Sequence, residues 1–176
     1  MRARILRGSA RREPAAPAPD GAMPQFTTER RVAHSAAAMF ALVADVERYP
    51  EFVPLCQSLA IRRRTSDDAG REVVVADMTV AFKIVRETFT TRVVLNRADH
   101  TIGISYLDGP FEHLDGSWSF EPQGNAGCRV VFAIDYAFRS RLLSTLMGAA
   151  FDNMFRRFIV AFEKRADEVY GTNAQS

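Results

Sequence analysis

The stretch that decides the fold reads SRLLSTLMGAAFDNMFRRFIVAFEKRADEVYG and runs from Ser140 to Gly171. Ser140 is a favourable N-cap, and Gly171 stands where a helix would end on a left-handed residue. The large apolar side chains recur every three or four residues, which is a helical period. We therefore predict one long helix from 140 to 170. Its apolar stripe contains Leu143, Met147, Phe151, Met154, Phe158 and Phe162, widened by Leu146, Ala150, Phe155 and Ile159.

A helix of this length would extend about 45 Å at 1.5 Å per residue. Only a sheet formed by the rest of the chain is broad enough to cover it. The stripe then has two interpretations. It is either ordinary core, or the wall of an adaptable apolar cavity between helix and sheet, because Phe and Met side chains suit both roles.

The chain before this helix alternates polar and apolar residues in the period of β-strands. Consecutive strands are separated by short turns, so the predicted sheet is antiparallel. Ser35 is expected to cap a short helix that follows the first strand, and the two prolines after it predict a second, broken helical turn. The expected strands cover residues 25–32, 59–64, 72–84, 85–96, 101–107, 111–121 and 130–138, and the short helix covers 35–46.

Composition indicates one globular domain with no strong electrostatic partner. The chain has 176 residues, 47% hydrophobic and 25% charged, with a net charge of +2. Residues 1–22 contain five Arg against Glu13 and Asp20, so they carry +3 and the remainder carries −1. This near-neutral balance argues against DNA as a partner. Cys56 and Cys128 are isolated, which fits a reducing compartment.

The two ends of the chain differ from the domain between them. Residues 1–24 are rich in Arg, Pro and Ala, and we expect a disordered, dispensable extension. It lacks the apolar core of a secretory signal, whereas its Arg-rich composition leaves a mitochondrial presequence open. Met23 is an alternative start. We assign residues 25–171 to a single domain and 172–176 to a flexible tail.

The sequence contains few of the residue patterns that are typical of an active site. Its histidines lie apart, without the spacing of a zinc site on one helix, and no phosphate-binding or nucleophile-elbow motif occurs. We therefore predict no catalytic residue and no metal site. One alternative stays open, because a carboxylate that faces inward from a strand could act as a general base. The candidate carboxylates are Asp77, Glu87 and Asp135, and the histidines are His34, His100 and His113.

Two separated motifs carry a family resemblance. The first is Tyr49-Pro50-x-Phe52-Val53-Pro54-x-Cys56, and the second is Leu107-Asp108-Gly109-Pro110-Phe111 followed by Leu114-x-Gly116-x-Trp118-x-Phe120. Over residues 24–170 the chain resembles the START-like (SRPBCC, polyketide cyclase/dehydrase-like) superfamily, and within it the coenzyme-Q-binding and ribosome-association-toxin branch. The resemblance implies an α+β helix-grip fold. In this fold a curved antiparallel sheet of about seven strands wraps a long C-terminal helix, with two short helices between strands 1 and 2.

The resemblance also implies a function, which is binding or carrying a hydrophobic isoprenoid quinone such as ubiquinone, in support of quinone biosynthesis or respiration. No other cofactor is implied. One alternative is a toxin-like protein that binds the ribosome, for which residues 62–64 form the only tight Arg cluster. A second is a polyketide cyclase or aromatase. We expect a monomer in the bacterial cytoplasm, peripheral at the inner membrane, or in mitochondria if the extension is a presequence.

The predicted ligand site has a cavity and a mouth. The two motif stretches should meet at one end of the domain and form the mouth, touching a membrane surface briefly during loading. Tyr49 should donate a hydrogen bond to a quinone carbonyl. Mouth residues are Tyr49, Phe52, Val53 and Phe111, and cavity residues are Trp118, Val130, Phe132, Ile134, Tyr136, Phe151, Met154, Phe155 and Phe158.

Overall fold

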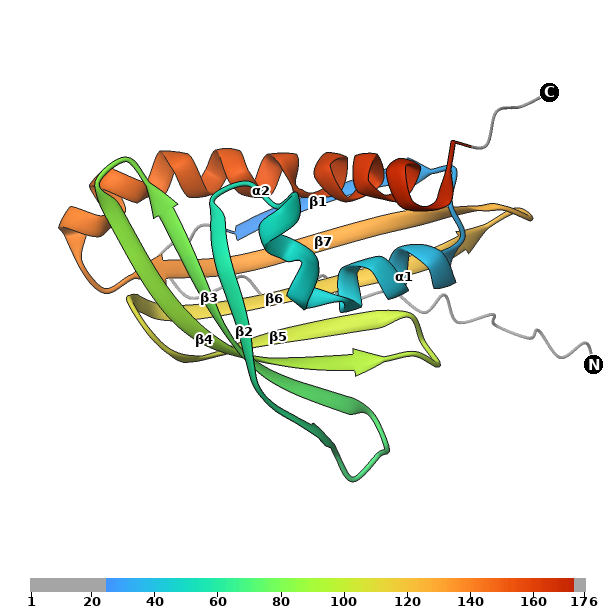
Figure 1. The fold of residues 1–176 in the computed structure, drawn as a ribbon, viewed down its shortest axis with the longest axis horizontal. Coiled ribbons are helices and arrows are strands. Elements are labelled where there is room, and N and C mark those ends of the chain that lie inside the picture. Colours follow the sequence, from blue (N-terminus) through green and yellow to red (C-terminus); the bar gives the residue numbers. More distant parts are fainter. Residues whose placement is uncertain (1–24, 173–176) are drawn as a thin grey trace, which may run out of the picture.

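A seven-stranded antiparallel sheet and one long helix form the domain in the computed structural model, which describes residues 25–172 (Figure 1). The sheet order is β1-β7-β6-β5-β4-β3-β2. Two short helices connect β1 to β2, so the predicted fold is confirmed. The elements are β1 Gln25–Val32, α1 Ala36–Ala44, the 3-10 helix η1 Val46–Glu51, β2 Cys56–Ser66, β3 Glu72–Phe82, β4 Val85–Asn96, β5 Thr101–Asp108, β6 Phe111–Gln123, β7 Gly127–Phe138 and α2 Arg141–Tyr170.

Residues 1–24 and 173–176 lie outside the described part of the chain. The predictions of a disordered extension, a presequence and a flexible tail fall on these residues and stay predictions.

Helix α2 begins and ends where the sequence predicts. The Ser140 hydroxyl accepts a hydrogen bond from the Leu143 amide at 3.3 Å, and Gly171 follows the helix with φ +81°. The buried face runs from Met147 to Ala166. Leu146 is exposed, contrary to the predicted stripe, because the first turns of α2 lie at the end of the sheet, where fewer neighbours cover them (Figure 1).

Helix α2 is fixed to one side of the sheet. It packs against β1, β7 and α1. Arg30 of β1 pairs with Glu163 at 2.6 Å, and the His34 ring contacts the Asp167 carboxylate at 2.6 Å. At the C-terminal end of α2, the Tyr170 hydroxyl donates to the Ala38 carbonyl at 3.3 Å. These contacts hold α2 over β1 and β7, which leaves the inner face of the other half of the sheet for a cavity.

The sheet curves around α2 (Figure 1). Register shifts interrupt the pairing of β2 with β3, of β4 with β5, and of β6 with β7. Such irregularities bend a strand and increase its local twist. The inward residues are those of the predicted alternation, including Val93 of β4 and Phe132 of β7. The predicted third strand was too long by two residues, because Lys83 adopts φ +54° and turns the chain from β3 into β4.

Candidate functional site

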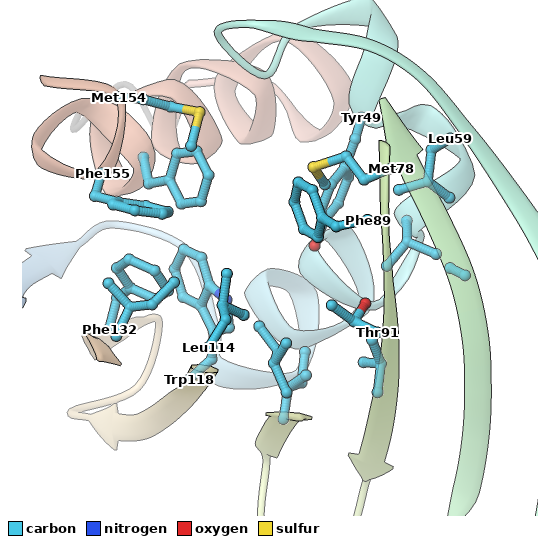
Figure 2. Close-up of a pocket in the computed structure, with 17 residues that line it drawn as sticks. Tyr49, Leu59, Met78, Phe89, Thr91, Leu114, Trp118, Phe132, Met154 and Phe155 are labelled. Atoms are coloured by element: carbon cyan, nitrogen blue, oxygen red, sulfur yellow. The ribbon is translucent and has the colours of Figure 1, made fainter. Parts of the chain in front are cut away.

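An apolar cavity of about 70 Å³ lies between α2 and the inner face of the sheet (Figure 2). Side chains from η1, six strands and α2 contribute to it. Among these lining side chains, oxygen and nitrogen atoms come from Tyr49, Thr91 and Trp118 alone. The full lining is Val46, Tyr49, Leu59, Ala76, Met78, Phe89, Thr91, Val93, Ile102, Ile104, Leu114, Trp118, Phe132, Ile134, Met154, Phe155 and Phe158.

The cavity exists because short side chains face α2 where the helix is not in direct contact with the sheet. Ala76 and Val93 are inward residues of β3 and β4, and neither reaches far enough to fill the space. Met78 and Met154 enter it from opposite walls (Figure 2). Unbranched methionine side chains adapt to gaps and to ligands of different shape. Of the two interpretations of the α2 stripe, the wall of a cavity fits Met154, Phe155 and Phe158, which line this space.

The structure brings some of the predicted site residues together in this lining. Helix α2 contributes three neighbouring side chains, and strands β6 and β7 face them. The Trp118 ring lies 4.5 Å from that of Phe132 and 6.4 Å from that of Phe158, measured between ring centroids. The predicted residues in the lining are Tyr49, Trp118, Phe132, Ile134, Met154, Phe155 and Phe158.

The other predicted residues lie outside the lining. Val130 and Val53 are buried core residues. The Tyr136 hydroxyl donates to the Asp152 carboxylate at 2.8 Å, and burial together with that carboxylate raises the Tyr136 pKa. Phe151 packs among aromatic rings at the N-terminal end of the buried face of α2. These residues do not touch the cavity, so they could affect ligand binding only through the side chains that they support.

Phe52 and Phe111 do not flank one opening as predicted, because they contact different levels of α2. The Phe52 ring packs on Phe162 at 5.1 Å, whereas the Phe111 ring packs against Phe151 at 5.8 Å. Those two helix residues are eleven positions apart, which is roughly 16 Å along the axis. Phe111 is fully buried and cannot flank an opening. A mouth formed by other residues of the two motif stretches stays a prediction.

The Tyr49 hydroxyl already has an acceptor. It donates a hydrogen bond to the Val43 carbonyl at 2.5 Å, and its ring packs edge-on against Phe162 at 5.3 Å. Burial is the main cause of its raised pKa, with smaller effects from Cys56 and Asp45. Because its proton is used within the protein, Tyr49 is not a free donor for a ligand carbonyl in this structure.

Thr91 is a lining residue that the sequence-based site lacks. It lies on β4 between the inward residues Phe89 and Val93, and it is 8% exposed. A polar residue at an inward register position was the signal available in the sequence. The signal was weak, because Thr is also favoured in strands for its branched side chain.

The three carboxylates considered as inward bases do not line the cavity. Burial acts to raise the pKa of Asp77, but hydrogen bonds from Thr90 and Arg62 outweigh it and lower that pKa. Asp135 contacts the His113 ring at 3.1 Å, away from the lining. Glu87 is half-buried, also outside the lining.

Neither thiol is poised for nucleophilic attack. Burial raises the pKa of Cys56 to about 11 and that of Cys128 to about 11. The Cys56 sulfur donates weakly to the Ser58 carbonyl at 3.7 Å. Between residues 25 and 172, no group of three metal-binding side chains is placed to hold an ion.

Comparison with known proteins identifies the family. The sequence profile of "Polyketide cyclase / dehydrase and lipid transport" matches residues 32–163. Ribosome association toxin RatA of Escherichia coli K12 is 35% identical over 148 residues, covering 84% of this chain and 90% of the toxin. The mitochondrial coenzyme Q-binding protein COQ10 homolog B of Xenopus laevis is 29% identical over 152 residues, covering 84% of this chain and 59% of that protein.

A solved structure supports the architecture independently. The Zhui aromatase/cyclase from Streptomyces sp. R1128 superimposes with a TM-score of 0.71, covering 88% of this chain and 100% of that chain. Its sequence identity is 18%, so the likeness concerns the fold alone.

Proposed function

The chain belongs to the polyketide cyclase/dehydrase and lipid transport family, and on that premise we propose that it binds and carries a hydrophobic isoprenoid quinone, ubiquinone, in the cavity between α2 and the sheet. The observation that carries this proposal is the composition of the cavity wall. Apart from Tyr49, Thr91 and Trp118, every lining side chain is apolar. The similarity to a coenzyme Q-binding protein points to the same class of ligand.

The physics of the cavity wall suits an isoprenoid tail. Each CH₂ group that leaves water for an apolar environment contributes about 0.8 kcal/mol. The lining also lacks carboxylate, histidine and cysteine side chains, and its one phenol, Tyr49, donates its proton to the Val43 carbonyl. A non-catalytic carrier remains our prediction, and the fold-level likeness to an aromatase/cyclase does not by itself assign that reaction.

The cavity must expand to hold such a ligand. Ligand pockets are typically about 300–1,000 Å³, whereas this cavity is about 70 Å³. Helix α2 packs on β1, β7 and α1, so the side of the cavity formed by β3 and β4 is where expansion meets least resistance. Rotation of Met78, Met154 and the half-buried Leu59 would enlarge it without breaking a hydrogen bond.

We further propose that the ligand is loaded from a membrane surface, at the end of the domain formed by the β3–β4 turn, the β5–β6 turn and the β7–α2 connection. We call this the Ile84 end. Ile84 is 97% exposed, and Leu142 in the first turn of α2 is 67% exposed. In the described part of the chain, the turns at the opposite end (67–70, 97–100 and 124–126) contain no exposed large hydrophobic side chain, although Val169 and Tyr170 at the C-terminal end of α2 are about half exposed.

Charge at the Ile84 end fits an anionic membrane. Four exposed cations lie in or beside the β3–β4 turn and the β7–α2 connection. A cation near an anionic bilayer contributes about 1 kcal/mol. Neither helix in residues 25–172 is long and apolar enough to cross a membrane. We propose that this end makes peripheral contact with a membrane, in a bacterial cytoplasm. The cations are Lys83, Arg86, Arg139 and Arg141, and the nearby carboxylates in sequence are Glu87, Asp108 and Glu112.

Organic extraction of the purified protein tests the ligand. The protein is produced in a quinone-containing host, extracted with solvent, and the extract is analysed by mass spectrometry. We expect ubiquinone at a stoichiometry well above that of a Phe155→Ala/Phe158→Ala variant, which removes two lining rings. A quinone-free extract from folded protein, together with no binding of added ubiquinone, would exclude the carrier proposal.

Ribosome binding is the second candidate, and it is favoured by the identity to RatA. The Arg cluster gives it little support. Arg62 pairs with Asp77 at 2.6 Å and Arg64 with Glu72 at 2.8 Å, which leaves Arg63 as the unpaired member of the three. Co-sedimentation with ribosomal subunits tests this candidate. Saturable binding that falls steeply with salt would support it.

A further inference from the structure

Two buried polar groups in the cavity wall have no partner. The Thr91 side chain is 8% exposed and the Trp118 side chain 2% exposed. Within residues 25–172, neither the Thr91 hydroxyl nor the Trp118 indole N–H makes a hydrogen bond. Thr90, the residue before Thr91 on β4, is buried to a similar extent. In contrast to Thr91, its hydroxyl donates a hydrogen bond to the Asp77 carboxylate at 2.5 Å. The two orphan groups both belong to the cavity lining.

Both orphan atoms border the open volume of the cavity. No polar side-chain atom in the described residues is both fully enclosed and unpaired. An unpaired atom must therefore touch space that a small molecule can enter. Figure 2 shows Thr91 and Trp118 entering the same space from different strands. Leaving such groups unpaired destabilises a fold, so their presence at this position needs a reason beyond packing.

We infer that Thr91 and Trp118 are the polar contacts of the ligand site, and that each donates a hydrogen bond to a carbonyl oxygen of an otherwise apolar, uncharged ligand. This inference rests on the proposed function and adds the chemistry of recognition. An indole N–H only donates, and a threonine hydroxyl can also donate. A carbonyl oxygen accepts from either group, and a ligand with two carbonyl oxygens can accept from both.

The same wall excludes two other ligand classes. A hydrocarbon leaves both donors unpaired. A fatty-acid carboxylate would bring a charge into a cavity whose lining contains no cation, and burying an unpaired charge is strongly unfavourable. A quinone head satisfies both conditions, because it is neutral and carries carbonyl oxygens.

Thr91→Val is the first test, with Thr90→Val as the matched control. Valine keeps the shape of threonine and removes the hydroxyl. We expect Thr91→Val to leave the melting temperature of the unliganded protein unchanged or higher, because it removes an unpaired group. Thr90→Val removes a made hydrogen bond on the other side of β4 and should lower the melting temperature without altering ligand affinity. A destabilised Thr91→Val protein would contradict the inference, since it would mean the hydroxyl serves the fold.

The second test uses Trp118 as a reporter, because the chain contains a single tryptophan. Its indole N–H gives one resonance in a proton–nitrogen spectrum. The probes are ubiquinone with one isoprene unit, the size-matched pair acetophenone and ethylbenzene, and decanoate. We expect ubiquinone to move the indole proton downfield and to bind roughly three- to tenfold more weakly to Thr91→Val. Acetophenone has one carbonyl and should bind better than ethylbenzene through one of the two donors. Thr91→Ser, which keeps the hydroxyl, should bind nearly as the wild type does.

The outcomes separate this inference from the proposed function. If acetophenone binds better than ethylbenzene, and either depends on Thr91 or moves the indole proton, while ubiquinone does not bind, the quinone proposal fails and the inference holds. If ubiquinone binds equally to wild type and Thr91→Val without an indole shift, the carrier proposal holds and the inference is overturned. Binding of decanoate as tight as that of acetophenone, or no binding of any probe, also overturns it.

Discussion

Phe155 and Phe151 lie one turn apart on α2, yet the same substitution should affect them differently. Phe155 lines the cavity, whereas Phe151 packs against Phe111, Phe138 and Tyr136 without reaching it. We expect Phe151→Ala to lower the free energy of unfolding by about 3–5 kcal/mol, as for a packed core ring. Phe155→Ala should cost less stability and weaken quinone binding roughly tenfold.

Urea denaturation and fluorescence titration with ubiquinone measure the two effects separately. Phe151→Ala serves as the control, because it perturbs the same helix outside the cavity. Equal losses of stability with unchanged quinone affinity in both variants would mean that the cavity wall is ordinary core.

Buried thiols and phenols should make the fold sensitive to alkaline pH. Burial raises the pKa of Cys56 and of Cys128 to about 11, against about 8.5 in an unfolded chain. Because the folded state favours the protonated form, this contribution is complete below the unfolded pKa and is lost as pH rises towards 11. We expect the urea midpoint to fall between pH 9 and pH 11.

A Cys56→Ser/Cys128→Ser variant is the control for this pH profile. Tyr49 and Tyr136, whose pKa values are also raised, should then account for the remaining loss, which begins nearer pH 10. A midpoint independent of pH up to 11 in the wild-type protein would contradict the expected ionisation.

At the scale of elements, the second sequence motif has a structural explanation in the β5–β6 turn. Gly109 has φ +136°, and a Cβ atom there would lie 2.7 Å from the Cβ of Phe89 and 2.9 Å from its Cα. The glycine therefore lets the turn pack directly on β4 and directs Phe111 into the core. We expect Gly109→Ala to destabilise the fold by several kcal/mol, about 3 or more, because backbone must shift as well as adopt a strained conformation.

The variant Gly124→Ala separates the cost of the positive φ from the cost of the close contact with Phe89. Gly124 also has positive φ, at +64°, but nothing lies within 4 Å of its missing Cβ. Gly124→Ala should lower the free energy of unfolding by about 1–2 kcal/mol, which is the cost of holding a residue with a Cβ atom at positive φ. The difference between the two variants in thermal unfolding measures the close approach at Gly109. Equal costs would show that φ, and not contact with Phe89, requires the glycine.

Sequence periodicity predicted the elements well, and tertiary contacts explain where it failed. Both ends of β4 and both caps of α2 follow from local residue preferences, and they agree with the structure. The strand predicted at 59–64 extends over Cys56–Ser66, because pairing with β3 lengthens it. No local pattern states which strands α2 leaves uncovered, so the sequence could suggest a cavity but not its wall. The motif aromatics Phe52 and Phe111 were assigned to a mouth, although they anchor turns to the core.

On the scale of the whole molecule, the two most exposed large hydrophobic residues of the described chain, Ile84 and Leu142, lie at the same end. Ile84, Leu107, Leu142 and Leu146 belong to the Ile84 end, and the cavity wall continues towards it along β3 through Met78 and Phe82. If this end contacts a membrane, its side chains should matter for transfer and not for folding. We expect Ile84→Ser/Leu142→Ser to keep the wild-type melting temperature, because both side chains are largely solvated. The variant should bind vesicles of phosphatidylglycerol and phosphatidylcholine roughly tenfold more weakly or worse.

The decisive comparison is with Val160→Ser, which removes a half-exposed apolar side chain from the outer face of α2, away from the Ile84 end. Vesicle flotation gives the bound fraction, and the rate of ubiquinone transfer between vesicle populations gives the functional consequence. Transfer should slow in Ile84→Ser/Leu142→Ser and remain unchanged in Val160→Ser, while both proteins bind water-soluble ubiquinone with wild-type affinity. Added salt should weaken flotation of the wild type, because exposed cations near the bilayer are screened. Equal transfer by all three proteins would remove the membrane contact from this end while leaving the cavity as the ligand site, since the two rest on different side chains.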